Sequence, residues 1–239
     1  MLKVEGVSSG YGNLHILSEV TLIAEPKEVT VIVGPNGSGK STLLKTVAGI
    51  TNLYQGSITM DGKSIAHLPP HEIARMGLAY LPQTESVFTQ LTVAENIKMA
   101  GYTVPREEFN SRLKGVSEMF PQVEKYMKTK VQNLSGGERQ MIAMSMALLR
   151  NPSVVMFDEP TANLSPKLAT QVLKTVGEVA KDFGLTVLLV EQNAKRALEM
   201  GDKAYLLVSG KNAFTGTAME LLNHTELARI YLGMKPANA

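Results

Sequence analysis

Residues 34–41 read Gly34-Pro35-Asn36-Gly37-Ser38-Gly39-Lys40-Ser41 and fit the pattern GxxxxGK[ST] of a phosphate-binding loop. An apolar run of β-branched residues, Val29–Val33, comes directly before the loop and predicts a buried parallel strand. A helical run, Thr42–Gly49, follows it. A strand, a glycine-rich loop and a helix in this order predict a polyphosphate site within an α/β fold.

Each residue type in this loop has a chemical reason to be there. Glycines let successive backbone N–H groups point toward a bound phosphate, and the helix that follows adds its dipole. Lys40 is expected to reach the β- and γ-phosphates, and the Ser41 hydroxyl is expected to bind Mg²⁺. The alternative is a glycine-rich turn that only packs a helix against a sheet, which lysine and serine in register disfavour. We therefore expect ATP and Mg²⁺ as cofactors, with ATP contacts from residue 34 through Thr42.

Short apolar runs separated by turn signals surround the loop. We expect strands at Leu2–Val7, Val20–Ala24, Val29–Val33, Ser57–Met60, Leu78–Leu81, Val154–Phe157, Thr186–Val190, Ala204–Val208 and Lys211–Thr215. Turn residues predict two hairpins, at Asp61-Gly62 and at Ser209-Gly210. Leu168, Val172, Val176 and Val179 have helical spacing. Strands that alternate with helices predict a largely parallel α/β core.

Helical spacing dominates between residues 84 and 150. Met141, Met144, Ser145, Leu148 and Leu149 share one helix face, and Asn151-Pro152 ends that helix. We expect a single domain over residues 1–239. Residues 1–83 and 151–239 form its α/β core with a β edge, and residues 84–150 form a helical subdomain.

Two carboxylates follow the apolar strand Val154–Phe157. They stand at the end of the strand, where the phosphate-binding loop is also expected to lie. Asp158 is placed to hold magnesium, commonly through water, and Glu159 can polarise the attacking water. The alternative is a strand end followed by a solvated acidic turn, and the accompanying phosphate-binding loop disfavours it.

A second helix start carries two glycines in the segment Leu134-Ser135-Gly136-Gly137-Glu138-Arg139-Gln140. Ser135 and Glu138 form an S-x-x-E capping box, so the simplest interpretation is a well-capped helix. A capping box does not need two internal glycines, however. Glycines there expose the N–H groups of the helix N-terminus and make an anion site without a charged side chain.

With this segment the chain resembles the ABC-transporter ATPases, whose signature LSGGQ varies to forms such as this LSGGE. The resemblance covers residues 2 to about 233. It implies a RecA-like P-loop core with an antiparallel β edge and an inserted helical subdomain. In that family the signature, here Ser135, Gly136, Gly137 and Glu138, faces the γ-phosphate bound to the opposite subunit. The resemblance therefore implies a head-to-tail dimer with nucleotide between the subunits.

The resemblance assigns roles to two further residues. Tyr11 lies where the family has an aromatic side chain that stacks on adenine. A lone loop tyrosine would otherwise be unremarkable. Gln83 matches a family glutamine that contacts magnesium and reports the nucleotide state to the segment that docks on the membrane subunit.

Two positions depart from the family pattern. Gln192 stands where most members have a switch histidine, and Ser165 stands where most have an aspartate. One explanation is a nucleotide binder that no longer hydrolyses ATP, which an intact Glu159 disfavours. The other is that the Glu-Gln-Asn form marks a subfamily. We expect hydrolysis at this chain's own site to be weakened, with Gln192 taking the catalytic histidine's place, and a second, non-identical ATPase subunit as partner.

Three short matches suggest which subfamily this is. Val190-Glu191-Gln192-Asn193-Ala194, Met119-Phe120-Pro121 and Tyr231-Leu232-Gly233 are similar to the ATPase subunits of branched-chain amino acid importers. Urea and short-amide importers have closely similar ATPases and stay as the alternative. Soluble ABC ATPases of DNA repair or translation usually carry a long coiled-coil insertion or two cassettes, and this sequence shows neither.

Composition limits the partners. The chain has 239 residues, 44% of them hydrophobic, and a net charge of +2 without a dense basic tract, so nucleic acid is not an expected partner. It has no cysteine, which excludes disulfides and thiolate metal sites. It also lacks the run of ~20 apolar residues that spans a bilayer. We expect it at the cytoplasmic face of the membrane, bound to integral permease subunits, with an external solute-binding protein delivering the solute.

Overall fold

The computed structural model describes residues 1–84 and 86–232, so Gly233 of the Tyr231-Leu232-Gly233 match lies outside the described residues. The strands are β1 (Leu2–Tyr11), β2 (Leu14–Ala24), β3 (Val29–Val33), β4 (Asn52–Met60), β5 (Lys63–Ser64), β6 (Leu78–Leu81), β7 (Val154–Asp158), β8 (Thr186–Val190), β9 (Lys203–Val208) and β10 (Lys211–Thr217). The helices are α1 (Lys40–Val47), α2 (Pro70–Arg75), α3 (Val93–Ala100), α4 (Arg106–Met119), α5 (Gln122–Lys125), α6 (Gly136–Leu148), α7 (Pro166–Asp182), α8 (Ala194–Met200), α9 (Ala218–Asn223) and α10 (Thr225–Leu232), with a 3₁₀ turn, η1, at Val131–Asn133.

A six-stranded sheet in the order β10-β9-β3-β8-β7-β6 forms the centre of the described chain. Its strands are parallel except for β10, which pairs antiparallel with β9. The strands β3, β7 and β8 are buried at every position, which explains their continuous apolar runs. The predicted parallel core and the β9–β10 hairpin are confirmed.

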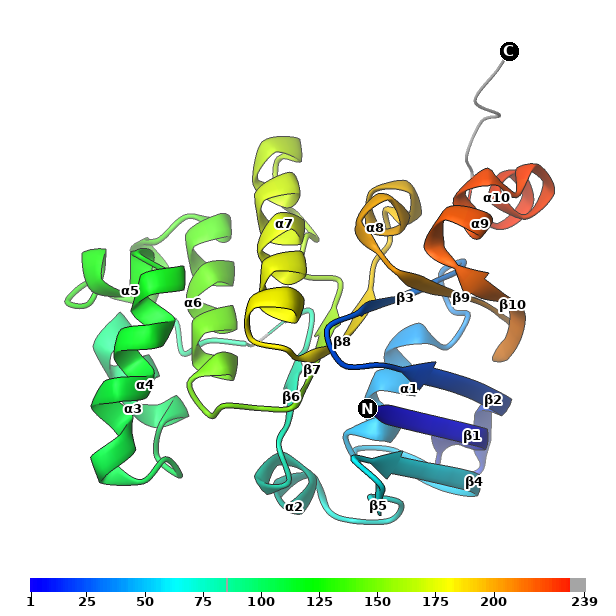
Figure 1. Cartoon of the computed structure of the whole chain (residues 1–239), viewed down its shortest axis with the longest axis horizontal. Helices are drawn as coiled ribbons and strands as arrows, with labels where there is room; N and C mark the ends of the chain where they lie inside the picture. The colour runs from blue at the N-terminus through cyan, green and yellow to red at the C-terminus, as the bar shows by residue number, and fades with distance from the viewer. Residues whose placement is uncertain (85, 233–239) are drawn as a thin grey trace.

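Alternate residues of this sheet face two different layers. Val31, Phe157 and Leu189 belong to a core shared with α6, α7 and α8. Their neighbours in the strands, such as Ile32 and Met156, belong to a second core shared with α1 and strands β1, β2 and β4. The sheet is thus covered by helices on one face and by α1 and a second sheet on the other (Figure 1). The strands that are buried on both faces, β3, β7 and β8, run parallel and therefore end at the same edge of the sheet.

The second sheet is antiparallel, in the order β2-β1-β4-β5. Asp61 and Gly62 both have positive φ, 49° and 78°, as the predicted tight hairpin between β4 and β5 requires. Strand β1 continues past the predicted end at Val7, because Ser8 and Ser9 keep pairing across register shifts instead of forming a loop. Serine and glycine are typical of turns, but here cross-strand pairing overrides that local preference.

Helices α3 to α6 lie together at one end of the molecule, beyond β6 (Figure 1). The predicted face of α6 is buried, from Met141 to Leu149. Regular helix begins only at Val93, because residues 86–92 make an irregular connection. The division of the chain into a core and a helical subdomain at residues 84–150 stays a prediction.

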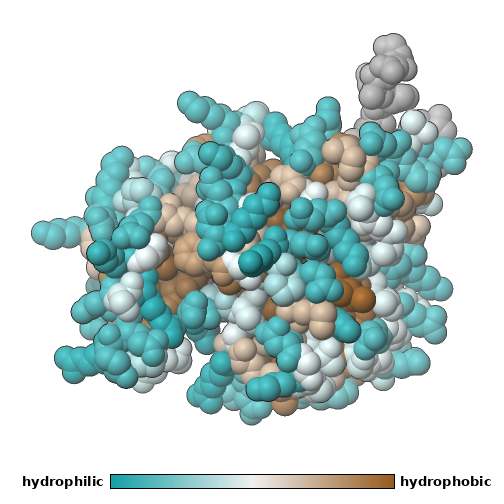
Figure 2. All heavy atoms as spheres, viewed as in Figure 1, coloured by the Kyte–Doolittle hydropathy of each residue, from teal (hydrophilic) through white to brown (hydrophobic). Residues whose placement is uncertain are grey.

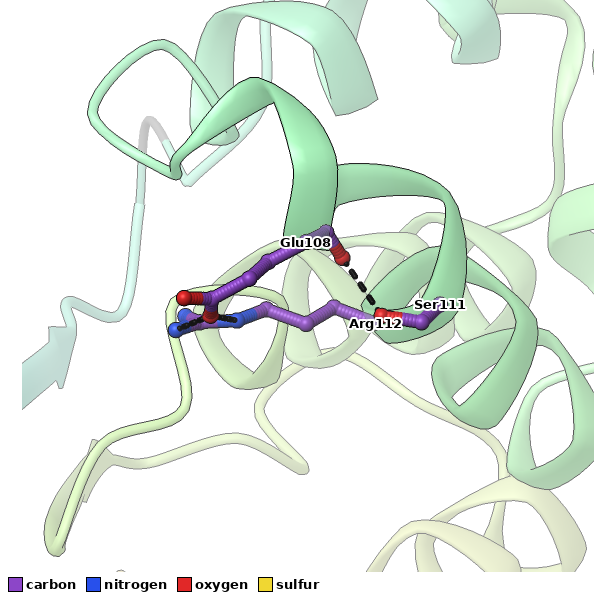
Figure 3. Close-up of polar contacts among 3 residues, drawn as sticks. All are labelled: Glu108, Ser111 and Arg112. Atoms are coloured by element: carbon purple, nitrogen blue, oxygen red, sulfur yellow. Dashed lines mark hydrogen bonds and ion pairs between the residues drawn. The ribbon is translucent and has the colours of Figure 1, made fainter.

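The outer helix α4 carries an ion pair on its exposed side. Arg112 Nε donates to Glu108 Oε2 at 2.9 Å, and Ser111 Oγ donates to the Glu108 carbonyl oxygen at 2.9 Å (Figure 3). An exposed pair at this spacing stabilises a helix by only ~0.3–0.5 kcal/mol. Hydrophilic side chains predominate on the face shown in Figure 2, and hydrophobic ones show in several separate patches, one of them between the helical end and the sheets. Among the residues that the structure describes, no helix is long and apolar enough to cross a membrane.

Candidate functional site

The phosphate-binding loop connects β3 to α1. Gly34 has φ 152°, and a Cβ there would lie 2.1 Å from the Leu207 carbonyl oxygen. Gly39 has φ 102°, and a Cβ there would lie 2.5 Å from Leu17 Cδ2. The loop therefore has its shape because these positions are glycine. Helix α1 begins at Lys40, two residues before the predicted start, with Gly39 as its N-cap.

Lys40 folds back across the loop. Its Nζ donates to the carbonyl oxygens of Gly34 and Pro35, both at 2.9 Å. Burial lowers the pKa of Lys40, while the negative charges of Glu159 and Asp158 act in the opposite direction. The ammonium group is thus already inside the loop, held by two carbonyl oxygens that a phosphate could replace.

Asp158 is held by two hydroxyl groups. Ser41 Oγ donates to Asp158 Oδ1 at 2.9 Å, and the Tyr80 hydroxyl donates to Asp158 Oδ2 at 3.0 Å. Burial, followed by the charge of Asp158, raises the pKa of Tyr80, so its hydroxyl keeps its proton and can donate. Ser41 and Asp158, which are 117 residues apart in sequence, are therefore joined directly, and their role as magnesium ligands stays a prediction.

Glu159 follows β7 in a strained backbone conformation. Its φ is 49°, a region that costs a non-glycine residue about 1–3 kcal/mol. Its N–H donates to the Val190 carbonyl oxygen at 2.9 Å, and its Oε2 accepts from Gln83 Nε2 at 3.0 Å. Burial raises the pKa of Glu159, and Lys40 opposes that effect. A carboxylate whose pKa is raised toward neutrality suits a group that takes a proton from water.

The phosphate-binding loop has the chemistry to hold a nucleoside triphosphate. Ser38 Oγ is buried and has no hydrogen-bond partner among the described residues, and a Cβ on Gly37 would meet open space. A phosphate oxygen would accept a hydrogen bond from the unpartnered Ser38 hydroxyl and would find open space beside Gly37. Mg²⁺ needs few protein ligands, because it keeps waters and binds phosphate oxygens. The paired Ser41 and Asp158 fit that requirement.

Tyr11 ends β1 with 43% of its surface exposed. The turn after it is fixed by β4, since the Gly12 N–H donates to Asn52 Oδ1 at 3.2 Å and the Tyr54 hydroxyl donates to the Gly12 carbonyl oxygen at 2.7 Å. Tyr11 is thus a partly exposed aromatic on a braced turn, as a stacking residue should be.

The signature segment starts helix α6. Ser135 is its N-cap, and the predicted capping box is present: Ser135 Oγ accepts from the Glu138 N–H at 3.3 Å, and Glu138 Oε2 accepts from the Ser135 N–H at 2.8 Å. Glu138 also contacts the Tyr126 hydroxyl, which lowers the pKa of Glu138. Its side chain is therefore engaged within its own chain.

The two signature glycines pack against the segment after Glu159. A Cβ on Gly136 would lie 3.1 Å from Leu164 Cδ2, and a Cβ on Gly137 would lie 3.0 Å from Leu168 Cδ2. Among the described residues no hydrogen bond links residues 135–138 to the phosphate-binding loop. The structure brings Lys40, Ser41, Gln83, Asp158 and Glu159 together, and among the described residues no hydrogen bond joins the signature to any of them.

Gln192 and Ser165, the two departures from the family pattern, lie at the ends of regular elements. Gln192 is exposed in the bend after β8, and its carbonyl oxygen accepts from the Ala194 N–H at 3.0 Å. Ser165 is the N-cap of α7, and its side chain makes no capping hydrogen bond. Neither substitution disturbs the elements around it.

Two residues near the carboxylates were missed by the sequence argument. Tyr80 lies in β6, three residues before Gln83, and looked like an ordinary strand residue. Glu191 follows the apolar run of β8, is 2% exposed and accepts from the Thr161 N–H at 3.0 Å. An acidic residue directly after a buried strand was a usable signal for Glu191, as it was for Asp158.

A cleft of about 880 Å³ opens beside Gln83. It is lined by Val87, Phe88 and Leu91 on one side and by Arg139 and Leu164 on another. It therefore runs from the glutamine that holds Glu159 to the start of α6.

The chain is similar to known proteins both in sequence and in structure. The family model described as ABC transporter matches residues 17–162. The chain is 49% identical over 234 residues to the "Probable branched-chain amino acid transport ATP-binding protein LivF" of Archaeoglobus fulgidus, covering 98% of this chain and 99% of the relative. It is 35% identical over 233 residues to the "High-affinity branched-chain amino acid transport ATP-binding protein BraG" of Pseudomonas aeruginosa, covering 98% and 100%. A solved dimeric ATP-binding cassette in a post-hydrolysis state with ADP and Pi superimposes with a TM-score of 0.77 at 25% identity, covering 91% and 99%.

Proposed function

The chain belongs to the ABC transporter family, and from this premise we propose that it binds and hydrolyses ATP to drive the import of branched-chain amino acids. The observation that carries the proposal is the hydrogen bond that joins Ser41, at the end of the phosphate-binding loop, to Asp158, with Glu159 as the next residue. It is an ATP-binding subunit of a transporter. The amino-acid substrate rests on the names of the two relatives at 49% and 35% identity.

Each residue of the site has a proposed part in hydrolysis. Lys40 leaves the carbonyl oxygens of its own loop and binds the β- and γ-phosphates. Ser41 and Asp158, with Gln83, would hold Mg²⁺, which would supply positive charge against the phosphates. Glu159 orients the attacking water and accepts its proton. Gln83 already donates a hydrogen bond to Glu159, so it can couple the position of that carboxylate to binding in the cleft beside Gln83.

The signature acts on a second nucleotide. Ser135, Gly136 and Gly137 stand at the start of a helix and apart from their own chain's phosphate-binding loop. A helix N-terminus attracts anions, so this surface suits the γ-phosphate held by another ATPase subunit. ATP binding would then close the dimer, and hydrolysis would remove the phosphate that joins the halves.

The cleft beside Gln83 is the proposed docking site for a permease subunit. Exposed Phe88 and partly exposed Val87 and Leu91 offer it apolar surface. A short cytoplasmic helix of the permease would sense Glu159 through Gln83. The chain would then lie at the cytoplasmic face of the membrane, peripheral to the permeases, with a solute-binding protein on the other side.

Reconstitution tests the substrate. The chain, its permeases, its second ATPase subunit and the solute-binding protein are placed in liposomes, and ATP hydrolysis is measured with leucine or urea outside. Leucine should stimulate hydrolysis several-fold and urea should not. Stimulation by urea with no response to leucine would assign the chain to the urea importers instead.

Replacing Tyr11 with alanine should weaken ATP binding moderately. Stacking of a base on an aromatic ring is worth about 1–3 kcal/mol, so the dissociation constant should rise by roughly 5- to 150-fold. Titration of a non-hydrolysable ATP analogue measures this, with Tyr102→Ala as control because Tyr102 is 88% exposed and lies in the connection after α3. An unchanged affinity would remove Tyr11 from the adenine site.

The partner is proposed to be a second, non-identical ATPase subunit. Gln192 can donate a hydrogen bond to a γ-phosphate but cannot carry the positive charge of a protonated histidine. This chain's own site would therefore hydrolyse ATP slowly. The other site would combine Ser135–Gly137 of this chain with the partner's phosphate-binding loop and histidine. The assembled complex should turn over faster than this chain does.

Replacing Gln192 with histidine should speed hydrolysis by the isolated chain. A hydrogen bond from a charged donor is worth roughly 1 kcal/mol more than a neutral one, so turnover should rise several-fold. Phosphate release is measured for the isolated chain and for the complex, with Gln171→His on the exposed side of α7 as control. If the isolated chain matches the complex and Gln192→His changes neither, the asymmetric dimer is wrong.

A further inference from the structure

Glu191 is a buried carboxyl group that the proposed mechanism does not use. It is the first residue after β8 and is 2% exposed, and its Oε1 accepts from the Thr161 N–H at 3.0 Å. Burial raises its pKa, which the hydrogen bond to Thr161 opposes. Acidic side chains are seldom this buried, because desolvation is costly unless a partner compensates. The partner here is a backbone group in the loop that follows Glu159.

That loop, residues 160–165, has Glu159 at one end and the signature contact near the other. Glu159 and Asn163 both have positive φ, 49° and 61°. The turns are closed by Ala162 N–H to the Glu159 carbonyl oxygen at 3.1 Å and by Leu164 N–H to the Thr161 carbonyl oxygen at 3.2 Å. Both hydrogen bonds lie within the segment 159–164. They shape it without fixing it to the sheet.

Two hydrogen bonds join this segment to the end of β8. The Glu159 N–H donates to the Val190 carbonyl oxygen, and the Thr161 N–H donates to Glu191. The first is a continuation of the sheet. The second hydrogen bond is accepted by a side chain, so a substitution of Glu191 can remove it. A strained conformation such as that of Glu159 persists only where its surroundings hold it.

We propose that Glu191 is a positioning residue for ATP hydrolysis, which fixes the loop 160–165 to the end of β8 and so holds Glu159 toward the attacking water. The inference rests on the proposed role of Glu159. Leu164 of the same loop packs against Gly136, so the anchor also couples the position of Glu159 to that of the signature residues 135–138. Gln192, which stands where most family members have the switch histidine, follows Glu191 directly and so lies in the same anchored segment.

Two substitutions at this position separate anchoring from packing. Glu191→Leu keeps the volume and removes the acceptor, whereas Glu191→Gln keeps an oxygen that can accept from the Thr161 N–H. With the full-length chain and Mg-ATP, Glu191→Leu should lower kcat by roughly 10- to 100-fold, since small misplacements of a catalytic group cost that much. Affinity for the non-hydrolysable analogue AMP-PNP should stay within about twofold, because the phosphate-binding loop is untouched. Glu191→Gln should recover most of the turnover.

Asp202→Ala is the matched control. Asp202 Oδ2 likewise accepts a backbone N–H, that of Val29 at 2.8 Å, but at the opposite end of the sheet from the site. This variant should keep its kcat even if its Tm falls. A carboxylate-to-backbone anchor that served only the fold would make the two positions behave alike.

Hydrogen exchange gives a readout that does not depend on turnover or on the stability of the leucine variant. In the wild-type chain without nucleotide, the Thr161 amide should exchange more slowly than that of Asn163, which donates no hydrogen bond within the described chain. Equal exchange at the two amides in the wild-type chain overturns the anchor. In Glu191→Leu the Thr161 amide should lose its protection.

Failure of the inference and failure of the proposed function give different results. Wild-type kcat in Glu191→Leu, with turnover lost in Glu159→Gln, overturns the anchor and leaves the ATPase assignment intact. Unchanged turnover in Glu159→Gln overturns the catalytic role of Glu159 on which the inference rests, and absence of turnover in the wild-type chain and its complex overturns the ATPase assignment itself. An equal loss of kcat in Glu191→Leu and Glu191→Gln also overturns the anchor, because the glutamine retains the acceptor.

Discussion

Replacing Glu159 with glutamine is expected to reduce ATP hydrolysis by roughly 10²- to 10⁴-fold, the usual contribution of a general base. The amide keeps the shape of the side chain but cannot take the proton of the attacking water. The contact with Gln83 is made at one side-chain oxygen, which an amide oxygen can replace, so the local structure should survive. Nucleotide affinity should be nearly unchanged, because Lys40, Ser41 and Asp158 are untouched.

Phosphate release at saturating Mg-ATP measures the loss, and AMP-PNP titration checks the affinity. The control is Glu178→Gln, on the outer face of α7, where Glu178 pairs with Lys174 at 3.4 Å. Wild-type turnover in Glu159→Gln would mean that another group activates the water. Glu159 would then have no catalytic part.

Replacing Lys40 with alanine should remove most of the affinity for the triphosphate. Each charge-assisted hydrogen bond is worth about 1.5–3 kcal/mol, so the loss of contacts to two phosphates should weaken binding by at least about 100-fold. The Lys40 ammonium group donates hydrogen bonds to the Gly34 and Pro35 carbonyl oxygens in the structure. Some loosening of the loop is therefore expected as well.

Titration of AMP-PNP measures this loss, with Lys45→Ala as the control. Lys45 lies in the last turn of the same helix, α1, away from the loop. A Tm close to that of the wild type would show that the fold survives without the loop contacts. A dissociation constant that changes less than about threefold would contradict the assigned role of Lys40.

The inner strands of the central sheet could be predicted well from the sequence because they are buried on both faces. Such strands read as short uninterrupted apolar runs, so β3 and β8 have their predicted bounds and β7 is longer by one residue, Asp158. Strand β6 also has its predicted bounds, although its two middle residues are only half-buried. The antiparallel strands were harder to delimit. Ser8, Ser9 and Gly10 look like a turn, yet β1 pairs on both sides through them.

Those parts of the site that consist of residues close together in the sequence could be predicted. The loop 34–41, the pair Asp158 and Glu159 and the capping box of α6 each occupy a few consecutive residues, and the family resemblance they carry is confirmed. Tyr80 and Glu191 were missed because their partners are distant in sequence. Their roles arise from the parallel register of the sheet, which puts the ends of β6, β7 and β8 side by side.

The central claim is that ATP joins two ATPase subunits through the signature of one and the phosphate-binding loop of the other. The most direct test is the molar mass of the Glu159→Gln chain by light scattering, with and without Mg-ATP. The account predicts a monomer without nucleotide and twice that mass with Mg-ATP, because the unhydrolysed γ-phosphate holds the halves together. A monomer at saturating Mg-ATP, in a variant that binds ATP normally, would contradict it.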